Sequence, residues 1–163
     1  MPTFIARHKI VTTVAALCLA AMAWLAFGYF EVQAAFIDDR VAEAAPSPSP
    51  DGANPFEAVA QGSFTSLAHD TSGIAKILDD GTRRVLRFEQ FTTSNGPDLN
   101  VYLVKGPGGS PDDGVDLGNL KGNIGDQNYE IGGDVDLAVY DTVVIWCVRF
   151  SSAFGEATVT STT

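Results

Sequence analysis

The chain has 163 residues, of which 45% are hydrophobic, 10 are basic and 20 are acidic, and its formal net charge is −10. This length suffices for one domain with appendages, and the excess of acid excludes a nucleic-acid-binding surface, which needs basic residues against phosphate. The imbalance is greatest beyond Phe30, because Arg7 and Lys9 precede that residue and no acidic residue does. An acidic domain of this kind is also repelled by an anionic lipid surface.

An apolar segment, Ile10 to Phe30, follows the basic tail of residues 1–9 and contains no charged side chain. It has about the ~20 residues that a helix needs to cross a bilayer, so we expect a transmembrane helix over residues 10–33. The basic tail places the N-terminus in the cytoplasm and the remainder outside, which predicts a single-pass protein of the cell membrane. The alternative is a signal peptide cleaved after Val32-Gln33-Ala34, although the apolar run exceeds the ~7–15 residues of a signal h-region.

Residues 34–55 form the predicted linker, whose centre is the run Pro46-Ser47-Pro48-Ser49-Pro50. Alternating proline and serine favour an extended chain without a core. At ~3.1 Å per residue, we expect this linker to act as a stalk that lifts the following domain roughly a few tens of Å off the membrane.

The predicted domain, residues 56–163, consists of short apolar runs separated by glycine, aspartate and asparagine. Residues 106–118 are expected to form a long loop, and residues 120–129, which include Gly122 and Gly125, an irregular segment. Strands are expected at 62–67, 74–78, 83–91, 99–105, 129–131, 137–140, 142–150 and 157–160. Short strands with turn signals every ~8–12 residues indicate an all-β sandwich or barrel.

The longest apolar run of the domain, Thr142 to Phe150, is rich in β-branched and aromatic residues, which favours a strand. Side chains alternate across a strand, so two faces can be distinguished. The face predicted to look into the core carries Val144, Trp146, Val148 and Phe150. The opposite face carries Val143, Ile145, Cys147 and Arg149.

Cys147 is the only thiol beyond the linker, since the other cysteine, Cys18, lies in the apolar N-terminal segment. A lone thiol in an exported domain is a candidate redox residue, and a buried core cysteine is the alternative. Arg149 is a candidate modulator of the thiol's acidity, because a nearby cation favours the thiolate. A thiol protease would need a base, and the domain offers only His69, which fits better as a solvated turn residue.

Acidic residues in glycine-rich loops raise the question of calcium binding; these are Asp112, Asp113, Asp116, Asp134 and Asp136. Their spacing does not match an EF-hand, and solvated loop acids fit better. One cysteine and one histidine are too few for zinc, and the domain has neither a methionine nor a haem-attachment motif. We therefore expect no metal and identify no cofactor and no complete active site.

Three segments in this order resemble those of a known family: Asn95-Gly96-Pro97-Asp98-Leu99, Leu120-Lys121-Gly122-Asn123 and Ile145-Trp146-Cys147. From about Phe56 to Thr160, the chain resembles the electron-transfer DM-thirteen domain. The resemblance implies an antiparallel β-sandwich, and it implies that Cys147 is the residue used in redox chemistry. In many relatives the domain is fused to DOMON and b-type cytochrome domains, so a separate redox partner protein is implied here.

Two functions follow as hypotheses. The first is a membrane-tethered extracytoplasmic domain with a thiol-based electron-transfer role through Cys147, bound to the bilayer through Ile10 to Phe30. The second is a non-catalytic extracellular adhesion or ligand-binding β-sandwich module in which Cys147 is a core residue. The reactivity of the Cys147 thiol in the folded chain distinguishes them.

Overall fold

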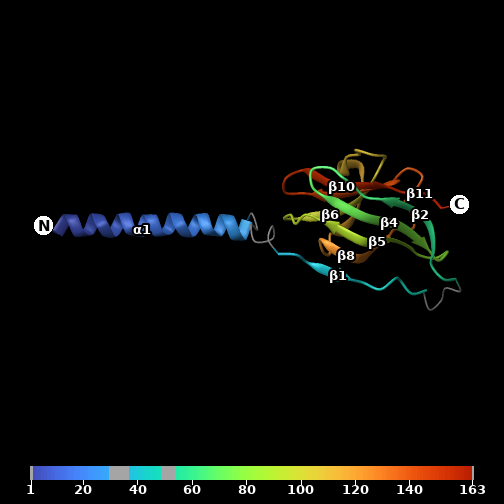
Figure 1. Cartoon of the computed structure of the whole chain (residues 1–163). Helices are drawn as coiled ribbons and strands as arrows, with labels where there is room; N and C mark the ends of the chain where they lie inside the picture. Colours follow the sequence, from blue (N-terminus) through green and yellow to red (C-terminus); the bar gives the residue numbers. More distant parts are fainter. Residues whose placement is uncertain (1, 30–36, 49–53, 163) are drawn as a thin grey trace.

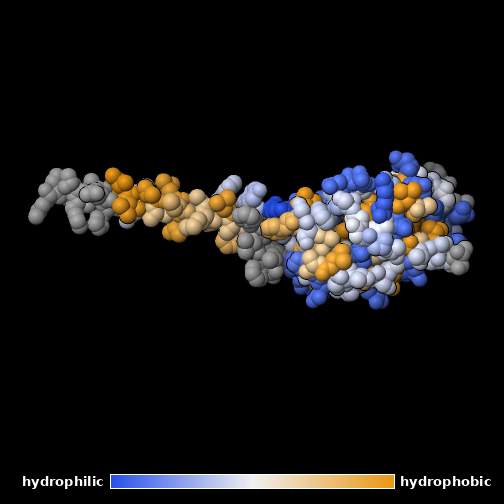
Figure 2. All heavy atoms as spheres, turned by 90° about the horizontal axis from the view of Figure 1, so that it is seen from above, coloured by the Kyte–Doolittle hydropathy of each residue, from blue (hydrophilic) through white to orange (hydrophobic). Residues whose placement is uncertain are grey.

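A computed structural model describes residues 2–29, 37–48 and 54–162 (Figure 1). The N-terminal part is helix α1 (Pro2–Trp24), which the π-helix η1 (Leu25–Tyr29) continues. The stretch Lys9–Tyr29 is long and apolar enough to cross a membrane, and the remainder of the described chain buries none of it (Figure 2). Such a helix is compatible with a single-pass anchor or a signal sequence. Residues 30–33 of the predicted span lie outside the described residues.

The domain is a sandwich of two β-sheets, as predicted. In spatial order, the first sheet contains β1 (Arg40–Ala42), β8 (Ile124–Ile131), β5 (Arg84–Thr93), β4 (Thr71–Asp79), β2 (Glu57–Ser63) and β11 (Thr160–Ser161). The second contains β3 (Thr65–Ser66), β10 (Ser152–Thr158), β9 (Thr142–Cys147), β6 (Leu99–Val104) and β7 (Val115–Asn119). The described strand pairs are antiparallel, except that β1 runs parallel to β8. A short 3-10 helix, η3 (Pro111–Asp113), lies in the predicted long loop.

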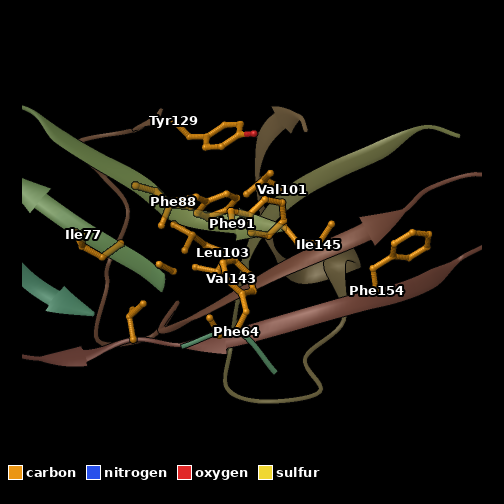
Figure 3. Close-up of a cluster of buried hydrophobic side chains, with 14 of the residues drawn as sticks. Phe64, Ile77, Phe88, Phe91, Val101, Leu103, Tyr129, Val143, Ile145 and Phe154 are labelled. Atoms are coloured by element: carbon orange, nitrogen blue, oxygen red, sulfur yellow. The ribbon is translucent and has the colours of Figure 1, made fainter. Parts of the chain in front are cut away.

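Aromatic rings fill the centre between the sheets (Figure 3). The ring of Phe64 lies 5.0 Å from the rings of both Phe88 and Phe91, and Tyr129 lies 5.3 Å from Phe88. Offset and edge-on pairs of this kind add about 0.5–1.5 kcal/mol each beyond the area they bury. The core therefore joins β5 and β8 of one sheet to the segment that leads into β3 of the other.

The prediction of which face of β9 looks inward was wrong. Val143, Ile145 and Cys147 belong to the core cluster between the sheets, whereas on the other face Val144 is buried, at 1% exposure, and Trp146 is half-buried. The strand also ends at Cys147, so the alternation does not continue to residue 150. Val148 and Phe150, which we had placed in the core, lie in the following turn and are 42% and 58% exposed.

Part of the predicted linker belongs to the sandwich. Residues 38–44, which we call the strap, lie along β8, with β1 paired from Arg40↔Ile124 to Ala42↔Asp126 (Figure 1). The Pro/Ser run follows the strap and leads to β2 of the same sheet. It therefore connects two strands of one domain and is not a stalk between helix and domain.

The segment predicted to be irregular, residues 120–129, contains the first part of β8, and its glycines explain both the error and the structure. Gly125 has φ +109°, and a Cβ there would overlap the carbonyl oxygen of Val41 in the strap. A Cβ at Gly122 would lie 2.5 Å from the carbonyl oxygen of Asp39. Glycine in a strand often marks the close approach of another backbone, and here that backbone is the strap.

The predicted strand at 137–140 is also wrong. This segment is a turn in which the carbonyl of Asp136 accepts the amides of Val139 and Tyr140, at 3.1 and 2.9 Å. The Asp136 side chain accepts the amide of Ala138 at 2.9 Å, which closes the turn. Short apolar residues next to an Asx-type cap resemble a strand entry when only the sequence is considered.

Candidate functional site

Cys147 is the last residue of β9 and lies inside the sandwich. It is paired with Leu99 of β6 on one side and with Ser152 of β10 on the other. Its exposed fraction is 0%. The side chain packs in the core cluster between the sheets, and a surface loop covers it at the end of the sandwich where β9 ends. The structure thus places the predicted redox thiol at the end of the core, one layer below solvent.

The covering loop, residues 94–98, holds the thiol directly. Sγ of Cys147 donates a hydrogen bond to the carbonyl oxygen of Pro97 at 3.0 Å. The next residue, Asp98, adopts a left-handed conformation with φ 62°, and its carbonyl accepts the amide of Val148 at 3.0 Å. The hydrogen bond to Pro97 and the complete burial of the side chain shield the thiol, so its chemistry requires the covering loop to open.

Phe154 of β10 packs under the same loop. A Cβ built on Gly96 would lie 2.6 Å from the Phe154 ring, so only glycine allows the loop to lie this close. His69 is stacked on the same ring, with the ring centroids 3.8 Å apart and an interplanar angle of 29°. Its amide donates to the carbonyl of Phe154 at 3.3 Å. His69 and Cys147 therefore lie at the same end of the sandwich, but no described hydrogen bond joins them as a base and a nucleophile.

Arg149 lies beyond the end of β9, so the strand alternation from which we predicted that it shares a face with Cys147 does not extend to it. It lies in the turn after β9, where Ser151 has φ 48° and donates its amide to the carbonyl of Val148 at 3.4 Å. Its guanidinium carbon lies 5.2 Å from the centroid of the Tyr29 ring in η1. Nη1 of Arg149 is shielded from solvent and has no hydrogen-bond partner within residues 2–29, 37–48 and 54–162. The cation therefore contacts the end of the helix.

Two of the loop acids considered for calcium, Asp116 and Asp136, act in local turns. Oδ1 of Asp116 accepts the amide of Gly118 at 2.8 Å, and Asp136 caps Ala138 as described above. Within the described ranges, no group of three or more His, Cys, Asp or Glu side chains is arranged to hold a metal ion. The carboxylates of Asp116 and Asp136 thus have structural partners in the turns that contain them.

A polar network on the outer face of the first sheet was not anticipated from the sequence. Its centre is Arg87, whose side chain is only 7% exposed and donates to Asp126 at 2.7 Å and to Glu89 at 3.1 Å. Arg87 also donates to the backbone carbonyl of Glu43 in the strap at 3.2 Å. Lys121 donates to the Glu43 carboxylate at 2.8 Å. The network therefore fastens the strap to β5 and β8.

Two carboxylates of this network have altered acidity. Burial raises the pKa of Glu43, but hydrogen bonds from Lys121 and the Asn128 amide, with the charges of Lys121 and Arg87, outweigh it and lower the pKa from its ordinary value. The pKa of Glu89 is lowered mainly by the hydrogen bond from Lys76, against the opposing effect of burial, with Arg87 assisting. Both carboxylates are therefore held in their charged form. The sequence signal that could have revealed the network is the pair Gly122 and Gly125, just before and within β8, where a Cβ would meet the backbone of the strap.

Comparison with known proteins gives one match. A family model described as "Electron transfer DM13", the DM-thirteen family of the resemblance above, matches residues 63–159. That range runs from the end of β2 to the residue before β11 and includes the covering loop, Cys147 and Phe154. No curated protein and no solved structure matches the chain. Since the match covers more than half of the chain, the protein belongs to the electron-transfer DM13 family.

Proposed function

We propose that this protein is an electron-transfer domain, tethered to a membrane by Ile10 to Phe30, whose redox group is the thiol of Cys147. The family description supports a redox role in general. The proposal for Cys147 rests on the thin cover of its thiol, which is one surface loop. Sγ of Cys147 donates a hydrogen bond to the carbonyl oxygen of Pro97 in that loop, at 3.0 Å. Opening that loop exposes the thiol without dismantling either sheet.

The chemistry requires a partner protein. The chain contains two cysteines, and the second, Cys18, lies in helix α1, so the domain has no internal thiol partner. In the proposed step, the thiolate of Cys147 attacks a disulfide of the partner. A bond forms between Sγ and one partner sulfur, the other partner sulfur leaves as a thiolate, and the Cys147 proton goes to solvent. The thiolate of a second partner then attacks the partner sulfur of the mixed disulfide; a disulfide forms between the two partner sulfurs, and Cys147 leaves as a thiolate that takes up a proton from solvent. The proposal assigns no cofactor to this chain.

Arg149 has a secondary part in this proposal. It lies two residues beyond the thiol, in the turn that joins β9 to β10. When the covering loop opens, the hydrogen bond between the Asp98 carbonyl and the Val148 amide must also break, which frees this turn. A cation that moves toward Sγ at that point favours the thiolate and makes Arg149 a modulator in the open state.

The test is the alkylation rate of Cys147 in the folded full-length chain carrying Cys18→Ser. We expect slow but measurable reaction with iodoacetamide under native conditions, at a rate independent of global unfolding. Gly96→Ala should accelerate it, because the new Cβ meets the Phe154 ring and displaces the covering loop. Gly133→Ala is the matched control, since a Cβ there meets nothing within 4 Å.

The second candidate function is a non-catalytic adhesion or ligand-binding module. The complete burial of Cys147, at 0% exposure within the core cluster, favours this alternative. In that case Cys147 reacts only when the whole domain unfolds, and Gly96→Ala reacts no faster than Gly133→Ala. Such a result would replace the redox proposal with the binding module.

The location at the membrane is part of the same proposal. Arg7 and Lys9 before the apolar segment favour a cytoplasmic N-terminus and an extracytoplasmic domain. We expect the mature protein to retain the segment Ile10 to Phe30, because its length exceeds that of a signal h-region. Mass spectrometry of the mature protein checks this, and an N-terminus near Ala35 would contradict it.

A further inference from the structure

The strap enters the sandwich at the end that contains Cys147. Oδ1 of Asp38 accepts hydrogen bonds from the side-chain amides of Asn95 and Asn123, at 3.1 Å each. Asn95 belongs to the covering loop above the thiol. From this point the strap runs away from the helix along the sandwich, as Figure 1 shows. The chain from the helix therefore arrives at the thiol end, and the Pro/Ser run lies beyond it.

The length of chain between helix and strap limits how far apart they can be. An extended chain spans at most ~3.3–3.6 Å per residue, so Tyr29 and Asp38 lie within about 30 Å of each other. The contact of Arg149 with the Tyr29 ring, at 5.2 Å, shows a closer approach. Tyrosine is enriched at the membrane–water interface, and Tyr29 ends the apolar stretch. The turn that carries Arg149 is thus at the level where a spanning helix leaves the bilayer.

Exposed apolar side chains gather at this end of the domain. Val148 and Phe150 lie in the turn after β9, and Leu67 is held at the same end of the sandwich because its amide donates to the Phe154 carbonyl of β10 at 2.9 Å. Leu67 is 46% exposed. Exposed apolar groups that cluster next to a cation are typical of surfaces that meet a lipid interface.

We infer that the tip formed by Val148, Arg149, Phe150 and Leu67 docks onto the bilayer that holds α1, with the apolar side chains at the headgroup boundary. This inference rests on the membrane tether of the proposed function. The arginine keeps its charge among headgroups while its neighbours reach the acyl boundary. Zwitterionic lipid suits the site, because the excess of acid in the domain opposes an anionic surface. A partner that reaches Cys147 in this orientation must itself lie at the same membrane surface.

The test uses the full-length chain with Trp24→Phe, reconstituted into phosphatidylcholine vesicles with and without brominated acyl chains. Bromine quenches tryptophan only at short range. A tryptophan is placed at the tip by Phe150→Trp, or by Val148→Trp should the first variant misfold. The matched control is Val139→Trp, a position 43% exposed in the turn before β9, at the opposite end of the sandwich.

We expect the tip variants to lose emission in brominated vesicles beyond the loss of the Trp24→Phe parent, and the Val139→Trp variant to match the parent. Flotation of the vesicles is measured in parallel. A chain that floats with the vesicles but shows equal quenching at positions 150 and 139 overturns the docking and leaves the tether standing. A chain that does not float overturns the tether and the docking together. The alkylation of Cys147 is independent of both results.

Discussion

Gly125→Ala is the sharpest perturbation of the strap. In β8, Gly125 has φ +109°, and a Cβ there would overlap the carbonyl oxygen of Val41. Because the obstacle is backbone, it cannot move aside as a flexible side chain would. We therefore expect the substitution to displace the strap from β8 while both sheets of the sandwich remain folded.

The magnitude follows from the strap's own contacts. Hydrogen bonds such as those from the Asp39 amide to Asn123 Oδ1, at 2.7 Å, and from the Glu43 amide to the Asp126 carbonyl, at 2.9 Å, contribute ~0.5–1.5 kcal/mol each. Ordering each residue of the strap costs ~1–2 kcal/mol, so docking is only marginally favourable. Its loss should lower the free energy of unfolding by about 1–2 kcal/mol, in addition to the ~1–3 kcal/mol for a non-glycine residue at positive φ.

Amide hydrogen exchange of the full-length chain measures the displacement, with Gly118→Ala as the matched control. Gly118 has φ +99°, and a Cβ there meets nothing within 4 Å, so this control carries the conformational cost without the overlap. We expect the amides of Asp39 and Glu43 to lose protection in Gly125→Ala alone. Equal protection of these amides in the two variants would refute the assignment of Gly125 as the residue that admits the strap.

Two further predictions concern stability. The pKa values of Glu43 and Glu89 are lowered in the folded chain, so the unfolded chain binds protons first as the pH falls. The contribution of these two carboxylates to the free energy of unfolding is therefore complete above their ordinary pKa of 4.5 and is lost as the pH falls below it. Urea midpoints between pH 7 and pH 3 check this, and Glu43→Gln should reduce the slope; an unchanged slope would contradict it. Ile145→Ala should lower the free energy of unfolding by about 2–5 kcal/mol, as expected for a core cavity, and Trp146→Ala by less, because Trp146 is half-buried. Losses in the reverse order would mean that Trp146 faces the core.

The fold class could be predicted from the sequence because short β-branched runs and turn residues recur along the domain. The inward face of β9 could not be predicted, because both faces of Thr142–Cys147 are apolar. The alternation of side chains then does not tell which face points into the core. The error came from counting Val148 and Phe150 as strand residues. The following turn takes them out of the sheet and leaves them exposed at the tip.

The sequence singled out Cys147 as the candidate redox residue, but it did not predict the surroundings in which the structure places this residue. Cys147 was found as the lone thiol of the domain, and the resemblance pointed to the same residue. Its cover is formed by Pro97, far away in sequence, through a backbone carbonyl that no side-chain pattern reveals. The strap was missed for a similar reason, because its pairing with β8 depends on glycines that, in sequence alone, indicate irregular chain.

The central claim is that Cys147 exchanges electrons from the folded state, and one measurement tests it most directly. The full-length chain carrying Cys18→Ser is equilibrated in glutathione redox buffers, and the mixed disulfide at Cys147 is quantified by mass spectrometry while hydrogen exchange monitors the fold. We expect reversible formation of the mixed disulfide in the folded chain, dependent on the ratio of oxidised to reduced glutathione, and none in Cys147→Ala. A Cys147 that remains a free thiol at every ratio until the domain unfolds would contradict the claim and identify it as a core residue of a binding module.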